Sequence, residues 1–319
     1  MGQASGGAAS SGAVTGAVTG AVTGTMMNNF HTFIQYTSAA YCNSDPTQMS
    51  TKIVCGSNAC PEIQSHDTHI VTTLEYVTPP TDRTAVTKGT ERESGGYIAL
   101  DNTAQRIVVS FHGSRDVEDW ITDTNTVFSV KAGLVDSDLC QGCKVHDGFQ
   151  DNWNDISQTV MAVVTGLHSV HPQYRITTTG HSLGAALATL SAAHLRQAMP
   201  GVPVDAYLYG SPRVGNPEFA DFVNAQSSRT EGQGSNTYRV THYDDPVPRL
   251  PGHLLGYAHI DTEYWLAPGG ATKIDYTPAD VKVCSGTYNK NCNSGTEFGK
   301  IDTQAHGYYL QKVSACKHS

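Results

Sequence analysis

The sequence lacks several features that would define other classes of protein. It has no apolar run long enough to span a bilayer, so we expect no transmembrane segment. It has no cluster of basic residues and a formal net charge of -9, so we expect no nucleic-acid partner. Charged residues make up only 15% of the 319 residues, and 39% are hydrophobic. A chain of this length and balance can bury a sizeable core in a single domain.

The beginning of the chain also lacks targeting signals. Residues 1–24 are rich in Gly, Ala and Ser, and residues 12–24 repeat Gly-Ala-Val-Thr three times, without the basic region or Leu-rich core of a signal peptide. Gly6 stands where N-myristoylation requires Ser or Thr. No Asn-x-Ser/Thr sequon occurs, so we expect no N-glycosylation. We expect residues 1–27 to be a disordered, low-complexity leader and residues 28–319 to form one domain.

The eight cysteines, by contrast, indicate an oxidising compartment and therefore a secreted protein. Three pairs are close in sequence: Cys55 and Cys60, Cys140 and Cys143, and Cys284 and Cys292. Pairing by proximity leaves Cys42 and Cys316 to join the two ends of the domain, although eight cysteines allow roughly a hundred connectivities. The alternative is a zinc site on Cys140, Cys143 and nearby His146. Because no second Cys-x-x-Cys completes it, disulfides are favoured and no metal is expected.

One strand–turn–helix stretch carries the strongest chemical signal. Arg175–Thr179 is a β-branched run typical of a strand, and Leu183–Ala198 is rich in Ala and Leu, as in a helix. Between them lies Gly180-His-Ser-Leu-Gly184, a Gly-x-Ser-x-Gly sequence in the setting that a nucleophilic serine needs. Both glycines must be small because the turn is tight. We therefore predict Ser182 as nucleophile and the Leu183 N–H as oxyanion donor. An ordinary Gly-punctuated turn is the alternative.

The other patterns alternate strands with helices. We expect helices over Phe30–Tyr41, Phe149–Ser169 and Pro217–Ala225, and strands over His69–Val77, Gly96–Leu100, Arg106–Phe111, Val204–Tyr209 and Thr237–His242. This alternation predicts an α/β fold with a mainly parallel central sheet flanked by helices. In such sheets the chemistry lies at the carboxyl ends of the strands.

A nucleophilic serine needs a base, and the base needs an acid behind it. In α/β-hydrolases the chain order is Ser, then Asp or Glu, then His. Asp244 and Asp245 follow the strand Thr237–His242 and precede a Pro-rich loop, where an orienting acid belongs. An Asp before Pro can also simply form a turn, and the spacing does not choose between the two.

Four histidines follow these carboxylates: His253, His259, His306 and His318. His318 is at the terminus, and His253 is too close to the acid in sequence to reach across easily. His259 fits a structural histidine in an edge strand. His306 stands in a loop entering the last helix, the commoner position for the base of this fold. His181 precedes the serine on a sharp turn, so we expect it to point away from the serine and to serve packing.

The second oxyanion donor should come from a loop after an earlier strand. Ser114 offers both its backbone N–H and its hydroxyl there. The next segment places Val117, Trp120 and Ile121 on one helical face, with acidic residues around the rest. A short amphipathic helix beside an oxyanion loop can act as a lid that hides an apolar slot in water. A surface helix packed by one face is the alternative.

Taken together, these stretches resemble the filamentous-fungal class 3 lipases. The matching segments are Val108–Arg115 with Trp120, Cys140–Phe149, Thr179–Ala185, Tyr209–Asn216, Tyr238–Pro251, Gly256–Trp265 and Ala305–His306. They follow one another in order and cover the chain from about Phe30 to Cys316.

The resemblance implies an α/β-hydrolase fold with Ser182 as nucleophile, Asp245 as acid and His306 as base. It also implies oxyanion donors at Ser114 and Leu183 and a helical lid around Val117–Ile121. The implied bridges are Cys42–Cys316, Cys55–Cys60 and Cys140–Cys143, with Cys284–Cys292 left as a fourth. The implied function is a secreted serine ester hydrolase without a cofactor. It would be a lipase that forms an acyl-enzyme from acylglycerols at an oil–water interface and contacts the lipid surface through its lid.

Other functions share this scaffold, including feruloyl or other aryl esterases and phospholipases. The predicted lid is unusually acidic, and polar Thr-Asp-Thr-Asn follows Ile121, which argues against strong interfacial activation. His112 stands where relatives often carry Arg. A catalytically silent binding homologue is the non-enzymatic alternative, against which the intact Ser182, Asp245 and His306 argue.

Overall fold

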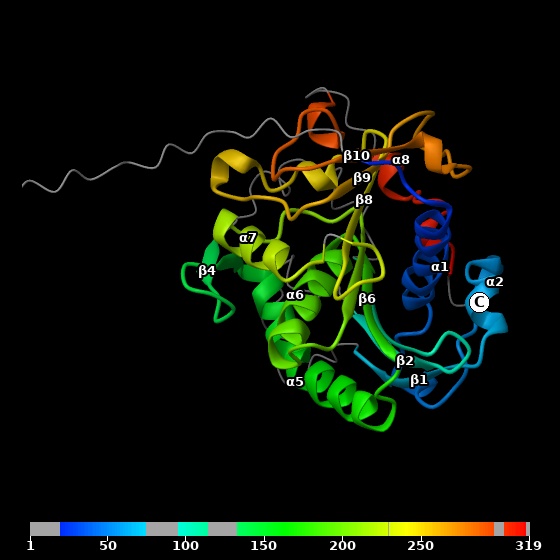
Figure 1. Cartoon of the computed structure of the whole chain (residues 1–319). Helices are drawn as coiled ribbons and strands as arrows, with labels where there is room; N and C mark the ends of the chain where they lie inside the picture. Colours follow the sequence, from blue (N-terminus) through cyan, green and yellow to red (C-terminus); the bar gives the residue numbers. More distant parts are fainter. Residues whose placement is uncertain (1–19, 75–94, 114–132, 229, 297–302, 317–319) are drawn as a thin grey trace, which may run out of the picture.

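An eight-stranded sheet organises the described part of the chain. The computed structural model describes residues 20–74, 95–113, 133–228, 230–296 and 303–316. Within them the strand order is β1-β2-β3-β6-β7-β8-β9-β10 (Figure 1). The strands are β1 Thr68–Thr73, β2 Gly95–Asp101, β3 Arg106–His112, β6 Arg175–His181, β7 Val204–Tyr209, β8 Thr237–His242, β9 Glu263–Leu266 and β10 Val281–Cys284.

The centre of the sheet is parallel and its two edges are antiparallel. Strands β3, β6, β7, β8 and β9 pair in parallel. Strands β1 and β2 add antiparallel pairings at one edge, and β10 adds one at the other. The predicted α/β fold is therefore confirmed. The carboxyl ends of the parallel strands define the edge of the sheet where a site belongs.

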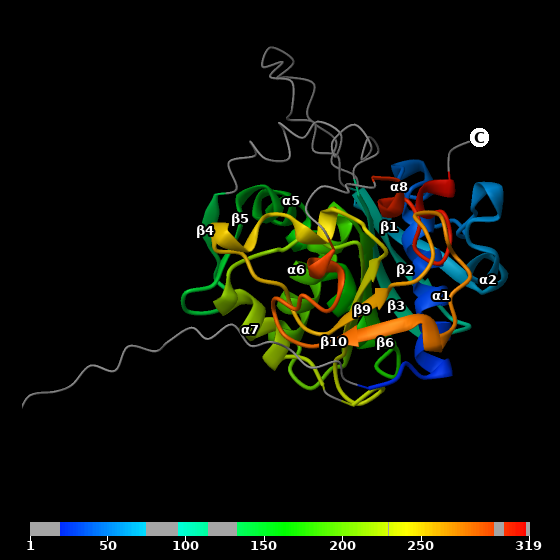
Figure 2. The ribbon, with the colours of Figure 1, turned by 90° about the horizontal axis from the view of Figure 1, so that it is seen from above.

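Helices cover both faces of the sheet (Figure 2). One face carries α1 Gly24–Ala40 and α2 Pro61–Ser65, and the other carries α5 Asp147–Val170, α6 Leu183–Ala198 and α7 Pro217–Ala225. A small sheet of β4 Leu134–Asp136 and β5 Lys144–His146 and the short helix α8 Thr303–His306 complete these elements. Two apolar clusters fill the two sides of the main sheet. None of the described helices combines the length and apolar character that a membrane span requires.

Helix α1 begins six residues before the predicted start at Phe30. Its N-cap is Thr23, whose hydroxyl accepts the Met26 N–H at 3.0 Å. The side chain of Met27 is buried in the same cluster as Phe30. The helix thus includes residues 24–27, which the sequence pattern assigns to the leader, because a threonine cap inside the repeated Gly-Ala-Val-Thr segment starts it.

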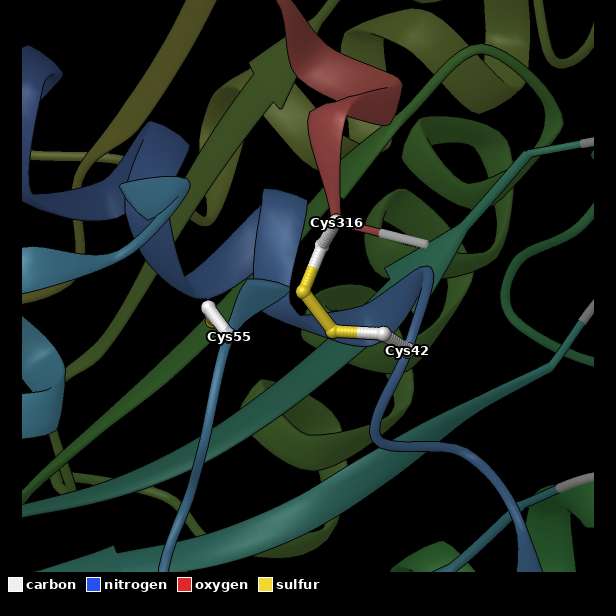
Figure 3. A group of neighbouring side chains, drawn as sticks. All are labelled: Cys42, Cys55 and Cys316. Carbon is white, nitrogen blue, oxygen red and sulfur yellow. A yellow bond between two sulfur atoms is a disulfide. The ribbon is translucent and has the colours of Figure 1, made fainter. Parts of the chain in front are cut away.

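Four disulfides stabilise the fold. They join Cys42 to Cys316, Cys55 to Cys60, Cys140 to Cys143, and Cys284 to Cys292, and no cysteine is free. Cys140 and Cys143, the candidate half of a zinc site, are thus bonded to each other. The bridge from Cys42 to Cys316 closes a separation of 274 residues, and long closed loops restrict the unfolded chain most. Figure 3 shows this bridge beside Cys55. The Sγ atoms of the three cysteines lie within 4.8 Å of one another.

Candidate active site

The turn between β6 and α6 holds Ser182 in a conformation that few residues adopt. Ser182 has φ 58° and ψ −128°, and its N–H donates to the Tyr209 carbonyl of β7 at 3.0 Å. A positive φ is unfavourable for a residue with a side chain, so the surrounding structure must hold it. Leu183 begins α6 directly afterwards, which places its backbone N–H at the helix N-terminus beside the serine.

The two glycines of the motif are required by close backbone contacts. A Cβ at Gly180 would lie 2.2 Å from the Gly184 carbonyl oxygen, and a Cβ at Gly184 would lie 2.5 Å from the Phe111 carbonyl oxygen. Neither contact can be relieved without moving the backbone of β3 or α6. The prediction that both positions must be small is therefore confirmed.

Asp245 and His306 lie together at the carboxyl edge of the sheet. His306 Nδ1 is 2.8 Å from Asp245 Oδ2, and both side chains are buried. Asp245 also accepts hydrogen bonds from the Tyr309 hydroxyl and, at 2.9 Å, from the Val247 N–H. Burial raises the pKa of Asp245, but the nearby His306 and these hydrogen bonds more than offset it, so the pKa lies below its usual value. Asp245 is therefore a carboxylate at neutral pH.

Asp244 faces a different partner. Its carboxylate forms an ion pair with Arg249, whose guanidinium also donates to the Asp244 carbonyl at 2.7 Å. Of the two neighbouring carboxylates, it is thus Asp245 that contacts His306.

The ring of His306 lies next to the nucleophile turn. His306 Nε2 is buried and has no hydrogen-bond partner among the residues that the structure describes. The His306 ring lies 4.4 Å from the ring of His181, the residue just before Ser182. Gly210, with φ 59°, leaves room for the His306 ring, because a Cβ at position 210 would lie 3.0 Å from His306 Cε1. A buried imidazole with one nitrogen held and the other unpaired is suited to accept a proton.

Several predicted residues fall beyond the described part of the chain. Ser114 and the lid residues Val117, Trp120 and Ile121 are among them, as is His318. The residue before Ser114 is described: a Cβ on Gly113 would lie 2.7 Å from Ser182 Cβ, so the start of that loop packs on the serine.

The other two candidate histidines have different surroundings. His259 is buried, and its Nε2 lies 2.6 Å from the Pro248 carbonyl oxygen. Burial and two arginines, Arg239 and Arg213, lower the pKa of His259 well below its usual value. The ring of His253 packs at a tilt against the ring of Tyr288 instead. Neither lies against Asp245.

His181 connects Tyr41 to His306 through hydrogen bonds. The sequence alone does not predict this connection. The Nδ1 atom of His181 lies 2.7 Å from the Tyr41 hydroxyl, and its Nε2 lies 2.8 Å from the His306 carbonyl oxygen. Burial and then the proximity of His306 lower the pKa of His181 to about 3, so its ring is neutral. A neutral ring fits one assignment: Nε2–H donates to His306, and Nδ1 accepts from Tyr41. The Gly113 N–H in turn donates to the Tyr41 oxygen at 3.2 Å.

Our expectation that His181 serves only packing is therefore corrected. Its ring belongs to a buried polar chain that joins the loop before Ser114 to the base. No local sequence pattern indicates this role, because Tyr41 and His306 are 140 and 125 residues away from His181.

We expect Tyr41→Phe to lower kcat about tenfold on a soluble ester and to leave KM nearly unchanged. The change removes both hydrogen bonds of the Tyr41 oxygen, each worth about 1 kcal/mol, and a tenfold effect corresponds to about 1.4 kcal/mol. These bonds orient groups that act in the transition state. Steady-state kinetics on p-nitrophenyl butyrate would measure this. Tyr97→Phe is the matched control, since it removes a buried hydroxyl that donates to the Tyr36 carbonyl, away from the site. Equal kcat values for the two variants would contradict the connecting role.

The fold and this site together define a serine hydrolase of the α/β-hydrolase class. Comparison with known proteins narrows the class. The family model for class 3 lipases matches residues 108–255, and the model for the lipase 3 N-terminal region matches residues 15–71. Secreted mono- and diacylglycerol lipase 1 of Fusarium solani is 40% identical over 290 residues, which cover 91% of this chain and 78% of that protein.

Two further relatives agree. Secreted mono- and diacylglycerol lipase A of Penicillium camembertii is 33% identical over 91% of this chain and 87% of its own. The crystal structure of the mono- and diacylglycerol lipase of Aspergillus oryzae superimposes with a TM-score of 0.77 at 32% identity, covering 91% of this chain and 98% of that one. The chain belongs to the class 3 lipase family. It is a serine ester hydrolase of the lipase type, and its disulfides and secreted relatives support an extracellular location.

Proposed function

We propose that this protein is a secreted lipase that hydrolyses mono- and diacylglycerols through an acyl-enzyme on Ser182. The observation that carries the catalytic part is the buried pair of Asp245 and His306, whose ring has an unpaired Nε2 and lies beside His181, the residue before Ser182. Preference for partial glycerides rests on relatives that carry this activity in their names and align over most of their length.

Acylation begins when Ser182 Oγ attacks the ester carbonyl carbon and His306 Nε2 takes the hydroxyl proton. Asp245 holds the Nδ1–H and stabilises the imidazolium that forms. The backbone N–H of Leu183 and the donors of Ser114 hydrogen-bond to the carbonyl oxygen and stabilise the negative charge that forms on it. Each donor lowers the activation free energy by about 3–4 kcal/mol. His306 then gives its proton to the glycerol oxygen, which leaves as the alcohol.

Deacylation repeats these steps with water. His306 Nε2 takes a proton from the attacking water, the tetrahedral intermediate forms again at the same donors, and Ser182 Oγ leaves with the proton from His306. The products are the fatty acid and the free enzyme, so no cofactor is needed. General-base assistance of this kind contributes about a hundredfold to ten-thousandfold. We further propose that Val117, Trp120 and Ile121 cover the acyl slot in water and contact the lipid surface when they open.

Initial rates on emulsified monoolein, diolein and triolein, with methyl ferulate alongside, test the proposal. We expect hydrolysis of monoolein and diolein at least about tenfold faster than that of triolein, and little hydrolysis of methyl ferulate. Equal rates on triolein would contradict the preference for partial glycerides. A higher rate on methyl ferulate than on every glyceride would identify an aryl esterase instead.

A further inference from the structure

Two consecutive leucines stand out on the surface. Leu254 is 89% exposed and Leu255 is 62% exposed, both in the 3₁₀ turn η5 His253–Leu255. Large apolar side chains exposed side by side cost free energy in water unless something covers them. We call residues 252–256 the leucine turn.

The leucine turn is held firmly from below. The Leu255 N–H donates to the Gly252 carbonyl and the Gly256 N–H to the His253 carbonyl, each at 3.0 Å. Arg213, itself buried, supports the base of the turn: its backbone N–H donates to the Leu250 carbonyl and its guanidinium to the Pro251 carbonyl, each at 2.8 Å. The leucines are thus presented on a fixed support.

The leucine turn lies on the same edge of the sheet as the active site. It follows Asp245 in the connection that leaves the carboxyl end of β8, and its support Arg213 belongs to the connection that leaves β7. That second connection begins at Gly210, where a Cβ would lie 3.2 Å from Asp245 Oδ2. One short backbone segment therefore touches the catalytic cluster at one end and supports the leucine turn at the other.

The chemistry of the turn favours an apolar phase. Residues 250–258 contain no Asp, Glu, Lys or Arg. Burial, followed by the charges of Arg213 and Lys290, lowers the pKa of His253, so this residue is uncharged at neutral pH. Nothing charged in the turn would lose its hydration if the leucines entered hydrocarbon. For a lipase, the apolar phase next to the active site is the lipid substrate.

We propose that the leucine turn anchors the protein to the surface of uncharged lipid by inserting Leu254 and Leu255 beside the active site. This inference rests on the proposed function for the kind of lipid. The anchor acts without any movement of the predicted lid, because both leucines are already exposed. It also carries no net charge, so its contribution to binding is insensitive to salt.

Binding without turnover tests the anchor. The full chain carrying Ser182→Ala is mixed with vesicles of phosphatidylcholine containing diolein, and the bound fraction is measured by flotation. We expect the additional change Leu254→Ser with Leu255→Ser to weaken binding at least tenfold. The matched control is Val170→Ser, which removes a 71% exposed side chain from the end of α5, just before β6 at the opposite edge of the sheet.

Two further measurements separate the outcomes. In the active enzyme, the double leucine change should slow hydrolysis of emulsified diolein and leave monomeric p-nitrophenyl butyrate unaffected. If the double variant and the control bind equally well, the anchor does not exist. If the wild type is a dimer without lipid and the double variant is a monomer, the leucines cover a second copy, which also overturns the proposal. If binding depends on the leucines but diolein is not hydrolysed, the proposed substrate is wrong and the anchor stands.

Discussion

Replacing Ser182 by Ala is expected to lower kcat for ester hydrolysis about a million-fold and to leave the melting temperature close to that of the wild type. The hydroxyl is the proposed nucleophile, and without it the acyl-enzyme cannot form, so only the weak catalysis of the remaining site persists. Alanine keeps the Cβ of the serine, so the close packing of Gly113 against this position is retained.

Turnover of p-nitrophenyl butyrate and thermal unfolding measure the two effects. Ser191→Ala is the matched control: Ser191 lies in the same helix α6, is buried, and its hydroxyl has no hydrogen-bond partner among the described residues. We expect this control to keep full activity. If Ser182→Ala retained more than about one hundredth of the wild-type rate, a different nucleophile would be required.

Asp245→Asn is expected to lower kcat about ten-thousand-fold, whereas Asp244→Asn should change it less than about threefold. An amide at position 245 can present an N–H to His306 Nδ1, which favours the wrong ring tautomer and removes the partner of the imidazolium. Asp244 contacts Arg249 instead, so its neutralisation affects an ion pair outside the proton path.

The two variants serve as controls for each other, because they remove the same charge from adjacent residues. Their kcat values on one soluble ester, with a thermal melt for each, are sufficient. The opposite ranking would move the acid to Asp244 and would contradict the assignment made from the contact with His306.

We propose two apolar contacts with lipid, the predicted lid and the leucine turn. The predicted lid around Trp120 is acidic and has to move, whereas Leu254 and Leu255 are uncharged and already exposed. Anionic lipid should therefore repel the acidic lid more than the uncharged leucine turn. Salt that screens this repulsion should raise rates on anionic emulsions without changing binding to neutral ones.

The sequence by itself determined the features that arise from neighbouring residues. The β-branched run and the Ala-rich stretch predicted β6 and α6 correctly, because these patterns are local. The steric limit at Gly180 is also local, since it comes from Gly184, whereas the limit at Gly184 comes from Phe111 in β3. The alternation of strands and helices also predicted the parallel centre of the sheet, because each strand and each helix has a hydrophobic periodicity that can be read locally. Close cysteine spacing also indicated three short bridges that the structure contains.

Only the tertiary structure decided which distant side chains meet. Spacing could not choose between Asp244 and Asp245, since adjacent residues leave a strand in different directions and only the folded loop shows that Asp245 faces His306. Likewise, His181 looked like a packing residue until the fold brought Tyr41 to one ring nitrogen and His306 to the other. Hydrogen bonds between groups more than a hundred residues apart depend on the whole chain being folded. No local pattern encodes them.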